Sequence, residues 1–213
     1  MTQTMTLSRR FAGREGGWAR PPRQVPTQTG PLEPLVGQRI LAILDCENLS
    51  YGSRDLGFHF AYDRLAALLR NVARTCALHA FFSREPGDAA ATRFVARCGW
   101  VAHPYDIQTV RSYRGTERLA NSDGLILFTS GLLASHSDAD VVVLASGDGA
   151  LVSDLARFLR SLPKPRRIVT LSLAGSTSWR LDARRNPAIT ANIEIGRDCL
   201  RPVDRSYRLK GAM

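Results

Sequence analysis

The sequence predicts an α/β fold in which helices cover both faces of a mostly parallel sheet. Short apolar runs, such as residues 40–44 and 141–144, are typical of strands that are buried on both faces. Segments with helical apolar spacing, such as residues 62–72, alternate with these runs. With 213 residues and 44% hydrophobic content, the chain is long enough to bury one core and short for two domains.

The expected elements follow one another from Arg39 onward. The strand at 40–44 precedes a helix at 62–72, in which leucines recur at helical spacing. A strand at 76–82, a helix at 88–98 with Asp88 as its N-cap, and a strand at 100–103 come next. The strand at 141–144 precedes a helix with an apolar stripe over 151–159, and then strands at 168–173 and 192–195. Residues 125–129 fit either a strand or a helix, and periodicity leaves them open.

Composition divides the chain into three parts. Residues 1–36 mix arginines with many prolines and glycines and have no periodicity, which predicts a basic, disordered arm. Residues 37–197 are the expected domain, and residues 198–213 form a basic tail. No apolar segment approaches membrane length, and no secretory signal is visible, so we expect a cytoplasmic protein that does not enter a membrane. The four scattered cysteines indicate reduced thiols and no zinc site.

The charge of the chain favours a polyanionic partner. The formal net charge is +10 and the isoelectric point is near 10.3, and phosphate contacts give affinity whatever the base sequence. However, only Lys164 and Lys210 of the 29 basic residues are lysine, which leaves 27 arginines (29 − 2). A GC-rich genome produces this bias without selection for binding. The charge therefore supports a nucleic-acid partner without deciding it.

Two aspartates stand where strands of a parallel sheet end. Asp45 follows the first strand, and Asp148 follows the strand at 141–144 through Ser146 and Gly147. Ligands of open parallel sheets lie outside the carboxyl ends of strands, and a strand order of the 3-2-1-4-5 type makes these two strands neighbours. Carboxylate oxygens select hard cations such as Mg²⁺ or Mn²⁺. Asp123, which opens the ambiguous segment, is the third candidate ligand.

Each of these acids also has a structural interpretation. Asp148 is a suitable cap for a helix beginning near Gly149, and Asp123 lies in an Asn-Ser-Asp run in which each residue is a good cap. Asp45 is harder to explain structurally, because a charge directly after five apolar residues of a central strand is costly unless something pairs with it. Glu47 and Asn48 add two more oxygen-bearing groups beside it.

Three segments resemble the motifs of NYN domains, which belong to the PIN-like nuclease superfamily. These segments are ILDCENL at 43–49, NSDGLIL at 121–127 and LASGDGALVSDL at 144–155, and the resemblance spans about residues 38–175. It implies a Rossmann-like (PIN-like) sheet in which Asp45, Asp123 and Asp148 hold the metal. It also implies a helix over 123–135. Asn48, together with Glu47 and Ser146, is expected to support the site.

The resemblance implies a metal-dependent ribonuclease that cleaves single-stranded RNA and leaves 5′-phosphate and 3′-hydroxyl ends. Two departures stand against activity, because many members have a further acid or amide where this chain has Ala150, and some have an aspartate where it has Thr129. The alternative is a catalytically weakened or inactive RNA-binding or adaptor module. In either case, a loop before Asp123 is expected to contact RNA, through phosphate binding and base stacking. Its candidate residues are Arg111, Tyr113, Arg114 and Arg118.

Two other enzyme classes fit the sequence less well. A phosphatase of the haloacid-dehalogenase type needs a second aspartate where this chain has Glu47, and a downstream lysine for which only Lys164 is available within the domain. A dinucleotide-binding oxidoreductase needs a Gly-rich turn after the first strand, which is missing. The sequence leaves open whether the chain forms a homo-oligomer or binds a protein partner.

Overall fold

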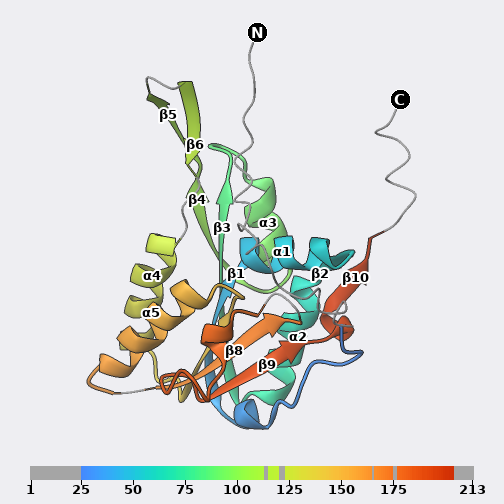
Figure 1. The fold of residues 1–213 in the computed structure, drawn as a ribbon, viewed down its shortest axis with the longest axis vertical. Coiled ribbons are helices and arrows are strands. Elements are labelled where there is room, and N and C mark those ends of the chain that lie inside the picture. The colour runs from blue at the N-terminus through green and yellow to red at the C-terminus, as the bar shows by residue number, and fades with distance from the viewer. Residues whose placement is uncertain (1–24, 113–114, 120–122, 165, 175–176, 204–213) are drawn as a thin grey trace, which may run out of the picture.

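A computed structural model describes residues 25–112, 115–119, 123–164, 166–174 and 177–203. Its centre is a six-stranded parallel sheet in the order β4-β3-β1-β7-β8-β9 (Figure 1). The strands are β1 (Arg39–Asp45), β3 (Thr75–Arg84), β4 (Val101–Asp106), β7 (Val141–Ala145), β8 (Arg167–Leu173) and β9 (Ala191–Ile195). The first strand therefore lies in the middle, between β3 and β7. The register pairs Leu44 with Ala145, so the residues that follow these two strands leave the sheet at the same level.

Helices cover both faces of this sheet, as the sequence predicted. One face carries α1 (Cys46–Asp55), α2 (Tyr62–Val72) and α3 (Ala90–Arg97), and the other carries α4 (Asp123–His136) and α5 (Gly149–Ser161). Alternate residues of β1 explain the two layers: Ile40 and Leu44 join the apolar cluster of the first face, and Leu41 and Ile43 join that of the second. The result is an α/β protein of the Rossmann-like type, with its central strands buried on both sides.

Most of the predicted elements lie where the apolar runs placed them, and the differences have local causes. Residues 125–129 belong to helix α4 and not to a strand. The third strand begins at Val101, because Trp100 is buried and its indole N–H donates to the carbonyl of Tyr62 at 2.9 Å. Helix α3 begins two residues after Asp88, whose carboxylate accepts from the backbone N–H of Ala90 at 2.7 Å. Asp88 therefore binds the first turn without being its N-cap.

The folded unit extends beyond the expected range of 37–197 at both ends. Val25 and Leu35 are buried in the core, so residues 25–36 are not part of a disordered arm. The backbone N–H of Thr29 donates to both carboxylate oxygens of Asp198 at 3.0 Å.

The remaining short elements are β2 (Phe58–Phe60), β10 (Leu200–Pro202), η1 (Glu33–Leu35), η2 (Trp179–Leu181) and η3 (Arg197–Cys199), of which β2 and β10 pair antiparallel.

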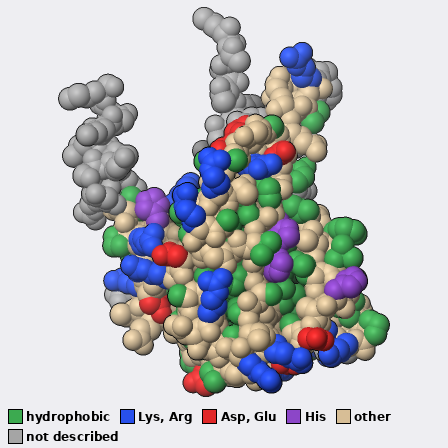
Figure 2. Space-filling model, turned by 180° about the vertical axis from the view of Figure 1, so that it is seen from behind, with side chains coloured by type: hydrophobic (Ala, Val, Ile, Leu, Met, Phe, Trp, Pro, Cys, Tyr) green, Lys and Arg blue, Asp and Glu red, His purple; other side chains and the backbone are tan. Residues whose placement is uncertain are grey.

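A hairpin stands out from the body of the molecule. It consists of β5 (Gln108–Ser112) and β6 (Gly115–Leu119), which form a two-stranded antiparallel sheet of their own. Figure 1 shows it rising beyond the carboxyl ends of the parallel strands, above α4 and β4. The loop that the sequence predicted before Asp123 is therefore a projecting hairpin. Seen from behind, basic side chains lie at its tip and others are spread over the body (Figure 2).

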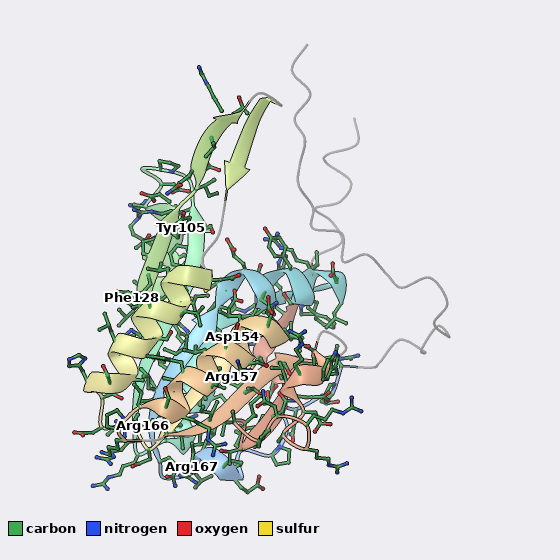
Figure 3. All side chains as sticks on the ribbon, turned by 60° about the vertical axis from the view of Figure 1, so that its left-hand side comes forward. Tyr105, Phe128, Asp154, Arg157, Arg166 and Arg167 are labelled. Atoms are coloured by element: carbon green, nitrogen blue, oxygen red, sulfur yellow. The ribbon has the colours of Figure 1, made fainter. Side chains whose placement is uncertain are left out.

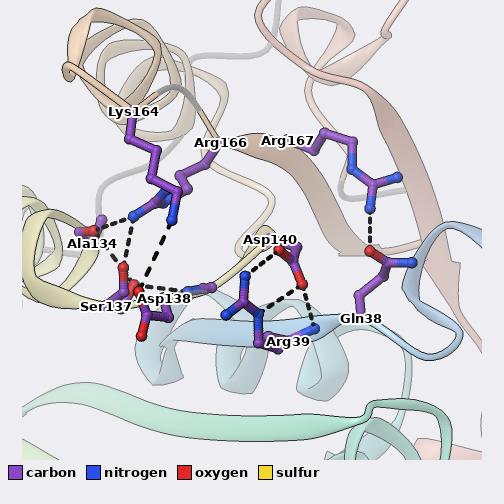
Figure 4. Close-up of polar contacts among 10 residues, drawn as sticks. Gln38, Arg39, Ala134, Ser137, Asp138, Asp140, Lys164, Arg166 and Arg167 are labelled. Carbon is purple, nitrogen blue, oxygen red and sulfur yellow. Dashed lines mark hydrogen bonds and ion pairs between the residues drawn. The ribbon is translucent and has the colours of Figure 1, made fainter.

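The opposite, amino edge of the sheet is held by polar contacts (Figure 4). The guanidinium of Arg39 at the start of β1 makes two hydrogen bonds to the carboxylate of Asp140, at 2.8 and 3.0 Å, and the Arg39 backbone N–H adds a third at 3.1 Å. These bonds hold the pKa of Asp140 well below its usual range. Arg166 is buried and donates to the carbonyl of Ser137 at 2.6 Å. This edge joins β1 to β7 at the end away from Asp45.

Candidate functional site

The candidate site is built around Asp45, which ends β1 and caps α1. Its Oδ1 atom accepts from the backbone N–H of Asn48 at 3.1 Å, and its Oδ2 atom accepts from the hydroxyl of Ser146 at 3.0 Å. The residue is only 8% exposed. Both of these hydrogen-bond donors are uncharged, so they stabilise the buried carboxylate through their dipoles and not through an opposite charge.

The turn after β7 interlocks with the turn after β1. The side-chain oxygen of Asn48 accepts from the backbone N–H of Gly147 at 2.6 Å. The hydroxyl of Ser146, which donates to Asp45, accepts from the backbone N–H of Asp148 at 3.1 Å. The sheet topology brings these residues together, because β1 and β7 are neighbours and end at the same level. Asn48 and Ser146 therefore fix the position of Asp45 relative to Asp148.

Asp148 caps helix α5, as its structural interpretation predicted. Its Oδ1 atom accepts from the backbone N–H groups of Ala150 and Leu151, at 2.8 and 3.2 Å. Such a cap satisfies two N–H groups that the first turn of a helix leaves without a helical partner. The side chain is half-buried, and it stands beside Ser146 at the edge of the site.

Asp123 and Glu47 add negative charge around Asp45. Asp123 is the first residue of α4 and is half-buried. Glu47 lies in the first turn of α1, and its carboxylate accepts from the backbone N–H of Ser83 at 3.1 Å, which ties α1 to the end of β3. The charges of both acids reach Asp45. The structure thus gathers the predicted acids at one edge of the sheet.

Burial raises the pKa of Asp45 to about 6. The hydrogen bonds from Asn48 and Ser146 lower this pKa, whereas the charges of Glu47 and Asp123 raise it. The charged groups that act on Asp45 are therefore acids, in a chain whose net charge is +10. Negative potential at this position, in a basic protein, favours a cation.

The donor atoms of the site suit Mg²⁺ or Mn²⁺, whereas the arrangement of these atoms suits the ions less well. Carboxylate, amide and hydroxyl oxygens are the donors that these hard cations prefer. However, within the described ranges no three His, Cys, Asp or Glu side chains lie close enough together to form a ready metal-binding group. Asp45, Asp123 and Asp148 share an edge of the sheet without converging into a closed three-carboxylate site.

Two of the four residues predicted to contact RNA, Arg111 and Arg118, lie on the projecting hairpin. Arg111 is exposed on β5, and Arg118 lies on β6, where its backbone pairs with Thr109. Tyr113 and Arg114 lie outside the described residues. The hairpin follows β4, so it rises from the same edge of the sheet as the acids (Figure 1).

One group of residues beside the site received no role in the sequence analysis. Trp179, which is 65% exposed, lies with several arginines in a groove of about 570 Å³ along α5. A signal for it was present: residues 179–185 place Arg180, Arg184 and Arg185 close after the tryptophan. This is the same mixture of aromatic and basic residues that drew attention to residues 111–118.

No protein-family model matches the chain, and no curated protein matches it. Among solved structures, the chain is similar to a protein of unknown function from Vibrio parahaemolyticus, with a TM-score of 0.57 and 20% sequence identity. The match covers 76% of this chain and 96% of that one. At this identity, the likeness extends to the fold alone. No helix in the described part of the chain has both the length and the apolar character needed to cross a membrane.

Proposed function

We propose that the chain is a metal-dependent ribonuclease of the NYN kind, within the PIN-like superfamily, that cleaves single-stranded RNA. The observation that carries this proposal is the buried carboxylate of Asp45 at the carboxyl end of the central strand, on which the charges of Glu47 and Asp123 act. Asp45 caps α1, but an uncharged Asn or Ser caps a helix about as well, so the cap alone does not require a buried charge, which is costly. A bound cation would offset that cost.

The surrounding contacts support a site whose purpose is to present carboxylates. Ser146 and Asn48 each join the end of β1 to the turn after β7, through the bonds to Asp45 and Gly147. Ser146 thereby orients one carboxylate oxygen of Asp45, and Asp148 follows two residues later at the same edge. The strand order supports the proposal because it places β1 between β3 and β7, so that the turns carrying Asp45 and Asp148 are neighbours.

A divalent cation held by Asp45, with Asp123 and Asp148 as further ligands, would activate water and neutralise charge on the phosphate. The chain itself contributes orientation and exclusion of water. Asp45 is fixed by two hydrogen bonds, and its burial limits water around the carboxylate. Arginines at the same edge would bind the phosphates that flank the cleaved bond.

The second candidate function is an RNA-binding or adaptor module without chemistry. One contact favours it: the Oδ1 atom of Asp148 already accepts two backbone hydrogen bonds from the first turn of α5, which is sufficient reason for an aspartate there. Ala150 and Thr129 point the same way, because neither supplies a further acidic ligand.

Cleavage of labelled single-stranded RNA by the full chain, in Mn²⁺ or Mg²⁺, tests the proposal. We expect products with 5′-phosphate and 3′-hydroxyl ends, and their loss in Asp45→Asn and Asp148→Asn. Asn is as good an N-cap as Asp, so both variants keep their helix caps. Asp55→Asn is the matched control, because Asp55 is an exposed acid at the far end of α1.

RNA affinity measured in EDTA separates the two candidates. A ribonuclease keeps its affinity in Asp148→Asn while cleavage disappears. Wild-type protein that is folded and binds RNA, but leaves it intact in both metals, contradicts the enzyme and supports the binding module.

A further inference from the structure

A basic groove runs along the side of α5 that is turned away from the sheet. Arg157 and Arg160 of α5 form one wall, and Trp179, Arg180 and Arg185 from the segment after β8 form the other. Figure 3 shows Arg157 and its neighbour Asp154 on α5, well away from Arg166 and Arg167 at the amino edge. The groove measures about 570 Å³.

The charge of the groove favours an anionic ligand. Four arginines line it, against the single carboxylate of Asp154. All four arginines are exposed. Guanidinium groups bind phosphate oxygens in a planar, two-pronged geometry, so a row of them matches a phosphodiester backbone.

Trp179 adds a surface on which a base can stack. Its indole is 65% exposed, so part of the ring is accessible to a ligand. The guanidinium carbons of Arg180 and Arg185 lie 5.7 and 5.9 Å from its ring centroid. Aromatic rings beside arginines are how proteins hold unpaired bases, because a base within a duplex has no free face.

The groove is joined to the candidate site by direct contacts. The backbone N–H of Ser178 donates to the carbonyl of Gly147 at 3.4 Å. Ser178 and Arg180 lie so close to Gly149 that a Cβ atom there would come within 2.2 Å of the Ser178 hydroxyl oxygen. Ala150, two residues after Asp148, lines the groove. One end of the groove therefore opens at the first turn of α5.

We propose that this groove binds a single strand of RNA, with a base stacked on Trp179 and phosphates on Arg157, Arg160, Arg180 and Arg185. The strand continues from the groove to the acids at the end of β1. The inference rests on the proposed function for its choice of RNA, and it assigns the substrate path to α5 in addition to the β5–β6 hairpin.

Fluorescence anisotropy with a labelled oligouridylate of about ten nucleotides, in EDTA, measures binding without cleavage. We expect Trp179→Ala to weaken binding about 5- to 100-fold, the range for loss of one stacked base, and Trp179→Phe to restore most of it. Arg157→Ala with Arg160→Ala removes two phosphate contacts, so the slope of log affinity against log salt falls by about 1.4.

The matched control is Arg93→Ala with Arg97→Ala, which removes two exposed arginines of α3 on the opposite face of the sheet. Equal losses in the control and groove variants would mean that affinity follows total charge, which overturns the groove. Wild-type affinity in the Trp179→Ala variant overturns the stacking site. A duplex that binds as tightly as the single strand, or an acidic peptide that competes as well as RNA, overturns the choice of ligand.

Failure of this inference is distinct from failure of the proposed enzyme. If the groove variants lose affinity while wild-type protein cleaves nothing, the RNA-binding groove is supported and the ribonuclease proposal is contradicted. If Asp45→Asn abolishes cleavage while the groove variants bind RNA as wild type does, the ribonuclease proposal is supported and the RNA-binding groove is contradicted.

Discussion

The hydroxyl of Ser146 donates to the Oδ2 atom of Asp45 at 3.0 Å. The same hydroxyl oxygen accepts from the backbone N–H of Asp148 at 3.1 Å, so its single proton is directed to Asp45. Oδ2 must then be an acceptor, and a proton that binds Asp45 has to go to Oδ1, where it competes with the hydrogen bond from Asn48. Ser146 thus favours the ionised form that a metal ligand needs, against the effect of burial.

Replacing Asp45 with Asn is expected to stabilise the protein. The pKa of Asp45 is raised from 3.8 to about 6, which corresponds to roughly 3 kcal/mol against the ionised form. Because the folded state binds this proton more tightly, stability from this group is greatest at low pH and is lost as the pH rises from about 4 to 6. Asn removes the charge and keeps the cap, but its NH2 group replaces the oxygen that accepts from Ser146, so we expect a net gain of about 1–2 kcal/mol near neutral pH, measured by urea unfolding.

The pH dependence of that gain is obtained from the difference in the free energy of unfolding between wild type and Asp45→Asn at each pH. His79 and His103 titrate in an overlapping range with the opposite sign, because burial lowers the pKa of both, that of His79 to about 4. Protonating them destabilises the fold as the pH falls, and this effect cancels in the difference. A gain that is the same at pH 4 and at pH 7 contradicts the assignment of the raised pKa to Asp45.

A divalent cation is expected to stabilise the wild-type protein and not the Asp45→Asn variant. Binding stabilises the folded state by about 1.4 kcal/mol when the free ion is tenfold above its Kd, which corresponds to roughly 3–6 °C in Tm for a chain of this size. Thermal unfolding in Mn²⁺ and in EDTA measures the shift. An equal shift of Tm in the variant would show that the metal does not bind at Asp45.

Ser146→Ala is expected to raise the pKa of Asp45 further and to lower stability by about 1–2 kcal/mol. The substitution removes the donor to Asp45 and the acceptor for the N–H of Asp148, in a place that is buried. NMR of the Asp45 carboxyl carbon against pH gives the pKa. Ser135→Ala is the control, since the Ser135 hydroxyl is exposed near the end of α4 and contacts Leu132 and His136 of the same helix.

Gly149→Ala is expected to destabilise the protein by about 1–3 kcal/mol through overpacking. A Cβ atom at this position would lie 2.6 Å from the Cβ atom of Ser178 and 2.9 Å from that of Arg180. Gly124→Ala, in the first turn of α4, meets nothing within 4 Å and should be neutral or stabilising, because Ala is a better helix former. Equal urea midpoints for the two variants would show that the segment after β8 is not held against α5.

Asp140→Asn is expected to lower stability, because it removes the negative charge and one of the two oxygens that accept hydrogen bonds from Arg39. The pKa of Asp140 is depressed in the folded state, so its contribution is present above about pH 4 and is lost as the pH falls. The variant should therefore differ from wild type at neutral pH and converge with it in acid, as thermal unfolding at both would measure. Asp138→Asn should have a smaller effect, since the Asp138 carboxylate is exposed and 3.9 Å from Lys164.

The sequence was sufficient for the sheet and for Asp45 because both depend on local pattern. Five apolar residues before Asp45 predict a buried strand, and the charge that follows them has few structural explanations. To predict that Asp45 and Ser146 lie close together, the strand order was also needed, since these residues are 101 positions apart.

Other features had no local signal. Helix α1 contains only Leu49 as a large buried apolar residue, so it has no apolar stripe to detect. The sequence predicted a loop at the hairpin, because the two strands pair with each other and bury no face in the core. The groove depends on the approach of Ser178 to Gly149, a tertiary contact between a helix and an irregular segment. Periodicity carries no information about such a contact.

The β5–β6 hairpin has a consequence for how proteins of this architecture diversify. It forms a sheet of its own, and a backbone hydrogen bond from the N–H of Ile107 to the carbonyl of Arg84 connects its base to the end of β3. Surface segments of this kind accept insertions and deletions that a packed core rejects. The length and charge of the hairpin can thus vary between lineages while the sheet and the acids at the strand ends stay unaltered.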